Sequence, residues 1–155
     1  MLVHTRVSGH VDVPIEQAWA FMRDIHTLPM WHVMVVEARD VVGTFDQVGS
    51  TGTLVLKAPD GLHDFHIEVT GVEPHRLVTH VGQQVDGPMR YTSTLHYVPA
   101  GLGFDWTWEQ DTDIPSGQPG PFGNETFMAR LMEQGIRQSA DNHKLLLEAM
   151  VPQPA

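Results

Sequence analysis

Three polar side chains in the second half of the chain have the chemistry needed to move a proton or to hold a substrate oxygen. Tyr91 lies in a strand-like segment, and Asn142 and His143 lie in a long helical segment near the C-terminus. The ordinary pKa of histidine is near neutrality, so His143 could act as a general base. The hydroxyl of Tyr91 and the amide of Asn142 could hydrogen-bond a substrate. We therefore predict Tyr91, Asn142 and His143 as the residues that would carry any catalysis.

Ser93, His80 and Gln84 are further polar candidates for the same site. For each candidate the alternative is a hydrogen-bonded wall residue without a chemical role. The orientation of His80 is open, because the alternating sets Leu77-Thr79-Val81 and Val78-His80-Gly82 compete for the inner face of one strand.

The sequence has no pattern typical of covalent or metal-dependent catalysis. It contains no cysteine, which excludes disulfides, thiolate nucleophiles and thiolate metal ligands. The histidines are scattered, and on a strand His63 and His66 would point to opposite faces, because side chains alternate. A nucleophile elbow and a glycine-rich phosphate loop are both missing from the sequence. We expect no metal site and no cofactor.

The charge balance argues against nucleic acid and membrane partners. With 9 Lys and Arg against 19 Asp and Glu, the formal net charge is −10, so the surface would on average repel phosphate backbones and anionic lipids. No apolar run is long enough to span a bilayer, and residues 1–6 do not resemble the start of a signal peptide. Together with the lack of cysteine, this favours a cytoplasmic protein, monomeric or homodimeric, without membrane insertion.

Aromatic side chains share one face on several predicted strands. Leu102, Phe104, Trp106 and Trp108 alternate with polar residues in one strand. Two other strands have the inward sets Tyr91, Ser93, Leu95, Tyr97 and Phe65, Ile67, Val69. These side chains could simply form a core, but the predicted C-terminal helix favours a cavity.

The inward stripe of that helix is small and polar in its middle. The stripe consists of Met128, Leu131, Met132, Gly135, Ser139, Asn142, His143 and Leu146. A glycine inside a helix costs about 1 kcal/mol relative to alanine, and a filled core would use larger apolar residues there. A small-molecule cavity explains the pattern. The predicted ligand-binding residues are Trp31, Phe65, Ile67, Tyr91, Ser93, Leu95, Trp106, Trp108, Met128, Leu131, Met132, Gly135 and Ser139.

The elements that would position these residues form an α+β arrangement. Two short helices are expected over 15–32, with Pro29 ending the first by disfavouring a helical Leu28. A loop over 114–123 leads to a helix that is capped by Asn124 and runs to Met150. Strands are expected at 2–13, 33–42, 52–58, 63–72, 76–85, 89–98 and 102–112. About seven antiparallel strands would wrap the long helix in one domain, 1–151, followed by a disordered tail, 152–155.

The order of motifs along the chain resembles the SRPBCC superfamily, which includes START, birch-pollen-allergen and polyketide cyclase/dehydrase proteins. The resemblance begins with Val13-Pro14-Ile15-Glu16-Gln17-Ala18-Trp19 and continues with Leu28-Pro29-Met30-Trp31. It extends through Val48-Gly49-Ser50, Val69-Thr70-Gly71-Val72-Glu73-Pro74-His75-Arg76-Leu77 and Leu95-His96-Tyr97-Val98-Pro99. The resemblance implies a helix-grip fold built around a ligand cavity.

Within that superfamily, the segment from Tyr97 to Leu147 is similar to bacterial aromatase/cyclases. Trp108-Glu109-Gln110-Asp111 and Pro119-Gly120-Pro121-Phe122 carry the similarity. Those enzymes use an arginine late in the fourth strand, where this chain has Gly71. Two hypotheses follow from the resemblance. The protein binds a small hydrophobic, aromatic or polyketide-like ligand and has cyclase/dehydrase-type activity, or it is a non-catalytic carrier, sequestering or self-resistance protein.

Overall fold

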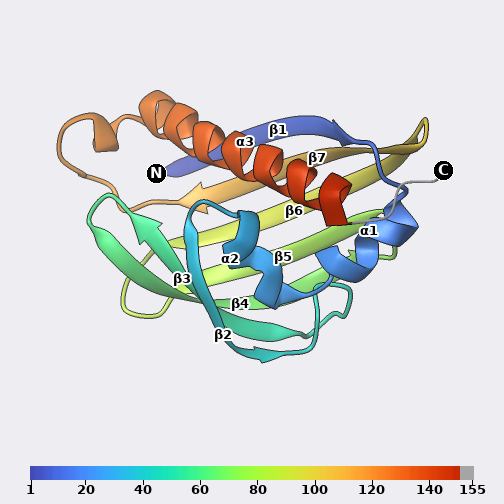
Figure 1. The fold of residues 1–155 in the computed structure, drawn as a ribbon. Coiled ribbons are helices and arrows are strands. Elements are labelled where there is room, and N and C mark those ends of the chain that lie inside the picture. The colour runs from blue at the N-terminus through green and yellow to red at the C-terminus, as the bar shows by residue number, and fades with distance from the viewer. Residues whose placement is uncertain (151–155) are drawn as a thin grey trace.

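Seven antiparallel strands form one curved sheet, and the long helix α3 (Glu125–Met150) crosses its concave face (Figure 1). This computed structural model describes residues 1–150, so the predicted tail at 152–155 lies outside the described residues. The spatial order of the strands is β1-β7-β6-β5-β4-β3-β2. The strands are β1 (Leu2–Val11), β2 (Val35–Val42), β3 (Thr51–Ala58), β4 (Gly61–Glu73), β5 (Leu77–Gln84), β6 (Arg90–Ala100) and β7 (Gly103–Asp113). The predicted α+β helix-grip arrangement is confirmed.

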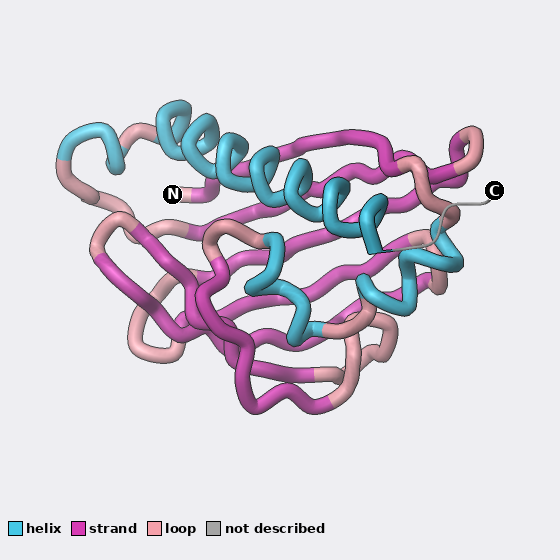
Figure 2. The backbone as a smooth tube through the Cα atoms, viewed as in Figure 1, coloured by secondary structure: helices cyan, strands magenta, loops and turns pink. Residues whose placement is uncertain are grey.

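The helices all lie on one side of the sheet (Figure 2). A single covered face requires strands that alternate between apolar and polar side chains, and β4 does so, burying Phe65, Ile67 and Val69. Leu102 is an exception to the predicted pattern, since it lies in the turn before β7 and is 84% exposed. The inward set of β7 therefore begins at Phe104.

The region after β1 contains α1 (Ile15–Met22), the short 3-10 helix η1 (Ile25–Thr27) and α2 (Leu28–Trp31). Asp24 begins η1, because its carboxylate accepts a hydrogen bond from the backbone N–H of His26. The expected effect of Pro29 was wrong. Leu28 is helical, and Pro29 occupies the first turn of α2, where a missing N–H costs nothing.

The inner face of β5 consists of Val78, His80 and Gly82. Both Val78 and His80 are buried, and His80 pairs with Ser93 of β6. Gly82 pairs with Tyr91, and a Cβ at Gly82 would lie 2.2 Å from Cε1 of that ring. The tyrosine ring therefore occupies the space that a side chain at position 82 would need. This packing fixes the orientation of β5, which the sequence left open, with His80 facing inward.

The helix α3 begins as predicted, with the Asn124 side chain accepting a hydrogen bond from the N–H of Phe127. Its most buried residues are Ile136, Ser139, Ala140 and Leu147. The stripe predicted for this helix contained only Ser139 of these four, and its Leu131 is 38% exposed. Relative to the predicted stripe, the helix is therefore rotated about its axis, so that the larger apolar side chains of Ile136 and Leu147 also face the sheet. A short 3-10 helix, η2 (Gly120–Gly123), lies in the loop before α3.

Candidate functional site

A cavity of about 640 Å³ lies between the concave face of the sheet and the helices. Its volume falls in the range of small-molecule sites. The walls are mostly apolar, and no aspartate or glutamate within residues 1–150 lines it. The aromatic lining residues are Trp19, Trp31, Phe45, Phe65, Tyr91, Tyr97, Phe104, Trp106 and Trp108.

The cavity reaches the surface beside α3. Among the lining residues, Met34 is 37% exposed, Leu131 is 38% exposed, and Pro59 in the β3–β4 turn is also exposed. Gly135 lies on this side of α3, and a Cβ there would have Met34 as its nearest neighbour at 3.9 Å. The rim is therefore built from apolar side chains of α3, the segment after α2 and one hairpin.

Most of the predicted ligand-binding residues line this cavity. They are Trp31, Phe65, Tyr91, Leu95, Trp106, Trp108, Met128, Leu131, Met132 and Gly135. Ile67, Ser93 and Ser139 do not line it, since each is fully buried in the surrounding packing. The hydroxyl of Ser139 donates to the carbonyl of Gly135 at 2.8 Å and accepts from the N–H of Val33 at 3.0 Å. Ser139 thus holds α3 against the segment after α2.

The three predicted catalytic residues occupy different places. Tyr91 and His143 line the cavity, whereas Asn142 does not. The amide of Asn142 instead donates to the backbone carbonyl of Trp31 at 3.3 Å. Gln84 holds the β5–β6 turn, where its Oε1 accepts from the N–H of Met89 at 3.2 Å. Both amides therefore bond to backbone groups, and neither Asn142 nor Gln84 lines the cavity.

The structure brings His80 and Tyr91 together at the cavity wall. The Nε2 atom of His80 lies 3.1 Å from the hydroxyl of Tyr91, and the rings meet edge to face. Burial lowers the pKa of His80 to about 4 and raises the pKa of Tyr91 above its ordinary value. Both groups are neutral at pH 7. The Nδ1 atom of His80 is buried without a hydrogen-bond partner in the described part of the chain.

A second polar group of rings contains Trp31, His32, Trp108 and His143, and all four line the cavity. The ring of His143 stacks on Trp31 with centroids 3.9 Å apart, and Trp31 and Trp108 meet at 6.2 Å. Desolvation lowers the pKa of His143 to about 3, with a smaller contribution from nearby His32. Desolvation also lowers the pKa of His32 to about 4, assisted by nearby His80. We did not expect His32 here, because it caps α2 and no periodic pattern covers it.

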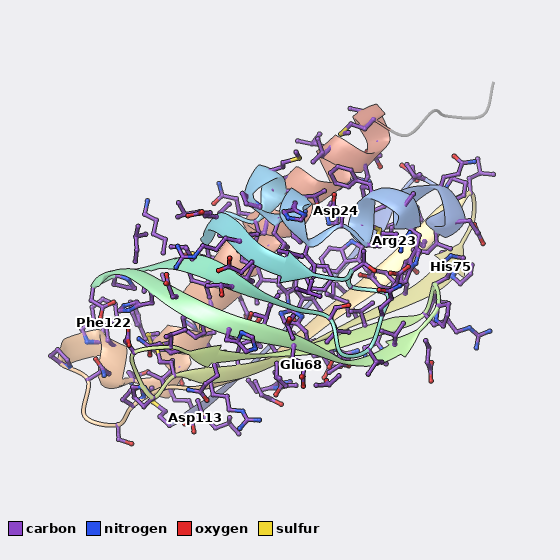
Figure 3. All side chains as sticks on the ribbon, turned by 90° about the horizontal axis from the view of Figure 1, so that it is seen from below. Arg23, Asp24, Glu68, His75, Asp113 and Phe122 are labelled. Atoms are coloured by element: carbon purple, nitrogen blue, oxygen red, sulfur yellow. The ribbon has the colours of Figure 1, made fainter. Side chains whose placement is uncertain are left out.

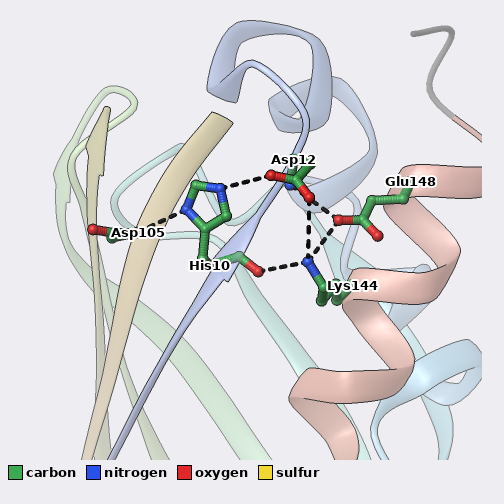
Figure 4. A network of polar contacts seen from close by, with 5 residues as sticks. All are labelled: His10, Asp12, Asp105, Lys144 and Glu148. Carbon is green, nitrogen blue, oxygen red and sulfur yellow. Dashed lines mark hydrogen bonds and ion pairs between the residues drawn. The ribbon is translucent and has the colours of Figure 1, made fainter. Parts of the chain in front are cut away.

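The cations around the cavity have acidic partners or lie at its edge. Arg23 pairs with Asp46 at 3.0 Å. In Figure 3, Arg23 and His75 lie toward one end of the sheet and Phe122 lies at the opposite end. Lys144 donates to Glu148 at 2.7 Å in the network of Figure 4. The third, Lys57, is exposed. The cavity interior is therefore apolar with neutral polar groups.

Gly71, where the resemblance to the cyclases predicts the counterpart of their arginine, does not line the cavity. Gly71 follows an irregularity in β4 that shifts the pairing after Val69. A Cβ at Gly71 would lie 3.5 Å from Cβ of Thr79, and neither residue lines the cavity. An arginine at this position of this chain would therefore begin on the side of Thr79 and not at the cavity wall.

Within residues 1–150, no three His, Asp or Glu side chains are grouped closely enough to hold a metal ion. None of the described helices combines the length and the apolar character required to cross a bilayer. The expectations of no metal and no cofactor remain predictions.

The comparisons with known proteins agree with this geometry. The family model described as polyketide cyclase / dehydrase and lipid transport matches residues 3–148. A search of curated protein sequences finds no match. Among solved structures, the di-domain ARO/CYC StfQ from the steffimycin biosynthetic pathway is 13% identical with a TM-score of 0.74, covering 96% of this chain and 51% of that one.

Two further structures show the same fold. DynU16, a putative protein in the dynemicin biosynthetic locus, is 17% identical with a TM-score of 0.66, covering 96% of this chain and 48% of that one. TTHA0849 from Thermus thermophilus is 15% identical with a TM-score of 0.74, covering 94% of this chain and 97% of that one. At these identities the likeness concerns the fold alone.

Proposed function

The chain belongs to the polyketide cyclase/dehydrase and lipid transport family, and from this premise we propose that it binds a small hydrophobic or aromatic ligand in the cavity under α3. The observation that carries the proposal is the cavity itself. Unfilled apolar walls lose packing contacts, and a ligand that fills the volume of about 640 Å³ between tryptophan, tyrosine and phenylalanine side chains would restore them.

The proposal is tested by binding of an aromatic probe such as 2-acetylnaphthalene. Binding should raise the melting temperature, since a ligand at a hundredfold excess over Kd adds roughly 2.7 kcal/mol to the free energy of unfolding. Gly135→Leu places a side chain at the cavity rim and should weaken binding at least tenfold. The control is Ala20→Leu on the exposed side of α1, which should leave the affinity unchanged. Equal affinity in all three proteins would overturn the proposed site.

Cyclase/dehydrase-type chemistry is a second candidate function, favoured by the His80–Tyr91 pair at 3.1 Å. A cavity that restricts a flexible polyoxygenated substrate would contribute to ring closure through geometry. Tyr91 would hydrogen-bond or protonate a substrate oxygen, and neutral His80 would exchange the proton with it. Alanine variants of Tyr91 and His80 should lose rate while they still bind the substrate.

The alternative is a carrier, sequestering or self-resistance protein for a hydrophobic natural product. It is supported by two features of the lining within residues 1–150. Gly71 does not belong to the lining, and the lining contains no acidic residue. Saturable binding of a polyketide-type compound without product formation supports this alternative. Turnover that depends on Tyr91 supports the enzyme.

A further inference from the structure

We propose that Trp31, His32, Trp108 and His143 form a hydrogen-bonding subsite for the carbonyl oxygen of an uncharged aromatic ligand. This inference rests on the proposed ligand-binding function and adds the chemical class of the ligand. We call these four rings the indole–imidazole cluster.

The indole–imidazole cluster is assembled from three elements that are distant in sequence. Trp31 and His32 end α2, Trp108 lies on β7, and His143 lies on α3. His143 stacks on Trp31 at 3.9 Å, and the centroid of His32 lies 5.4 Å from that of Trp108. Because every ring also lines the cavity, a ligand that fills the cavity meets this cluster.

The cluster has more hydrogen-bond donors than partners. The Nε1 atoms of Trp31 and Trp108 and the Nε2 atom of His143 are buried, and within residues 1–150 none has a hydrogen-bond partner. A buried polar group without a partner costs roughly 1–3 kcal/mol. An indole N–H can only donate, so both tryptophans require an acceptor atom. A ligand oxygen would remove that cost once the rings turn to bring these atoms to the cavity surface.

A carbonyl oxygen fits this requirement better than a charged group. It accepts two hydrogen bonds and brings no donor that would need a further partner. The Nδ1 atom of His32 accepts from the N–H of Met34 at 3.2 Å, which fixes its neutral ring with the hydrogen on Nε2. Burial lowers the pKa values of His32 and His143, since an environment with little water disfavours charge. A carboxylate would lose its hydration here without meeting a cation.

The other polar pair at the cavity wall differs in one respect. In the His80–Tyr91 pair, the hydroxyl of Tyr91 already has His80 as its partner at 3.1 Å, so only the Nδ1 atom of His80 is left unpartnered within residues 1–150. The indole–imidazole cluster has two indole N–H donors, both unpartnered within residues 1–150, on rings whose centroids lie 6.2 Å apart. We therefore assign the first ligand oxygen to the cluster.

The test uses two probes that differ only at one oxygen, 2-acetylnaphthalene and 2-ethylnaphthalene, with 2-naphthoate as the charged analogue. Dissociation constants are measured by equilibrium dialysis, which does not depend on tryptophan fluorescence. Trp31→Phe and Trp108→Phe keep an aromatic ring but remove the N–H. Each should weaken binding of the ketone relative to the hydrocarbon about five- to tenfold, the effect of one lost hydrogen bond. The control is Trp106→Phe, a cavity tryptophan outside the cluster, which should leave the ratio unchanged.

The outcomes distinguish failure of the subsite from failure of the proposed ligand-binding function. A shift of the ratio in Trp108→Phe or Trp31→Phe, without a shift in Trp106→Phe, supports the subsite. If both neutral probes bind but the ratio is the same in all variants, the subsite is overturned and the ligand-binding function stands. Binding of 2-naphthoate as tight as that of the ketone also overturns the subsite. If neither neutral probe binds the wild-type protein, the proposed function fails and the subsite fails with it.

Discussion

The imidazole of His143 on α3 stacks face to face on the indole of Trp31 at the end of α2, with centroids 3.9 Å apart and planes 7° apart. The neighbouring Asn142 strengthens the same junction, because its amide donates to the carbonyl of Trp31. The two helices that cover the cavity are therefore joined by a ring whose neutral form the environment favours. Protonation of His143 would place a charge in that junction.

The free energy of unfolding should decrease as the pH falls from about 6.5 to about 4. In the folded state the pKa values of His32 and His80 are about 4 and that of His143 is about 3, all below the ordinary 6.5. The unfolded chain therefore binds more protons in this window, and each histidine contributes a loss of about 1.4 kcal/mol per pH unit.

Urea unfolding at pH 7.5 and 5.5 measures this decrease. His143→Phe keeps an aromatic ring on Trp31. It should reduce the pH dependence of the free energy of unfolding by roughly the contribution of one histidine. His10 acts in the opposite direction, because its contacts with Asp105 and Asp12 raise its pKa, but it is exposed (Figure 4). His10→Asn should therefore not flatten the decrease. A free energy of unfolding that increases as the pH is lowered from 7.5 to 5.5 would contradict the assignment of these histidines as buried and neutral.

Gly135→Ala should raise the stability by about 1 kcal/mol. Glycine inside a helix costs about this much relative to alanine, and a Cβ at position 135 has no neighbour closer than 3.9 Å. Thermal and urea unfolding measure the change. Gly82→Ala is the matched control at a crowded glycine, where the new Cβ would lie 2.2 Å from Tyr91, and it should be clearly destabilising. Destabilisation by Gly135→Ala would show that this glycine is needed for packing.

Removing the Tyr91 hydroxyl should destabilise the protein and expose its coupling to His80. Tyr91→Phe removes the only partner of the buried Nε2 atom of His80 within residues 1–150, which costs roughly 1–3 kcal/mol. In the background of His80→Leu the same change should cost about 1 kcal/mol less, as a double-mutant cycle measures. Tyr97→Phe, on the same strand, is the control and should show no coupling to position 80. Additive effects of the substitutions at 80 and 91 would contradict the hydrogen bond.

Ser139→Ala should cost about 1–2 kcal/mol, although the substitution favours helix formation. The N–H of Val33 loses its acceptor, and the segment before β2 loses its attachment to α3. Because this segment includes Met34 at the cavity rim, binding of the aromatic probe should also change. Ser116→Ala, at an exposed position in the loop before α3, should have no measurable effect on either property. Unchanged stability in Ser139→Ala would mean that the hydroxyl bridge contributes nothing.

The local pattern of the sequence was sufficient to predict the sheet and the long helix. Alternation of apolar and polar residues identified the inward faces of β4 and β6, and Asn124 marked the start of α3. These features depend on neighbours along the chain, because side-chain direction in a strand or helix follows from the local backbone geometry. For the same reason, most of the predicted ligand-binding residues line the cavity.

The tertiary structure decided the features that depend on contacts between distant segments. His80 faces inward because β5 pairs with β6 in the register that places Gly82 beneath the ring of Tyr91. Gly71 leaves the inner face because of an irregularity in β4 that alternation cannot reveal. His32 and His143 belong to segments more than a hundred residues apart in sequence, and only the packing of α2 against α3 brings them to one cavity wall. Periodicity determines which way a side chain points, whereas the pairing of elements determines what it meets.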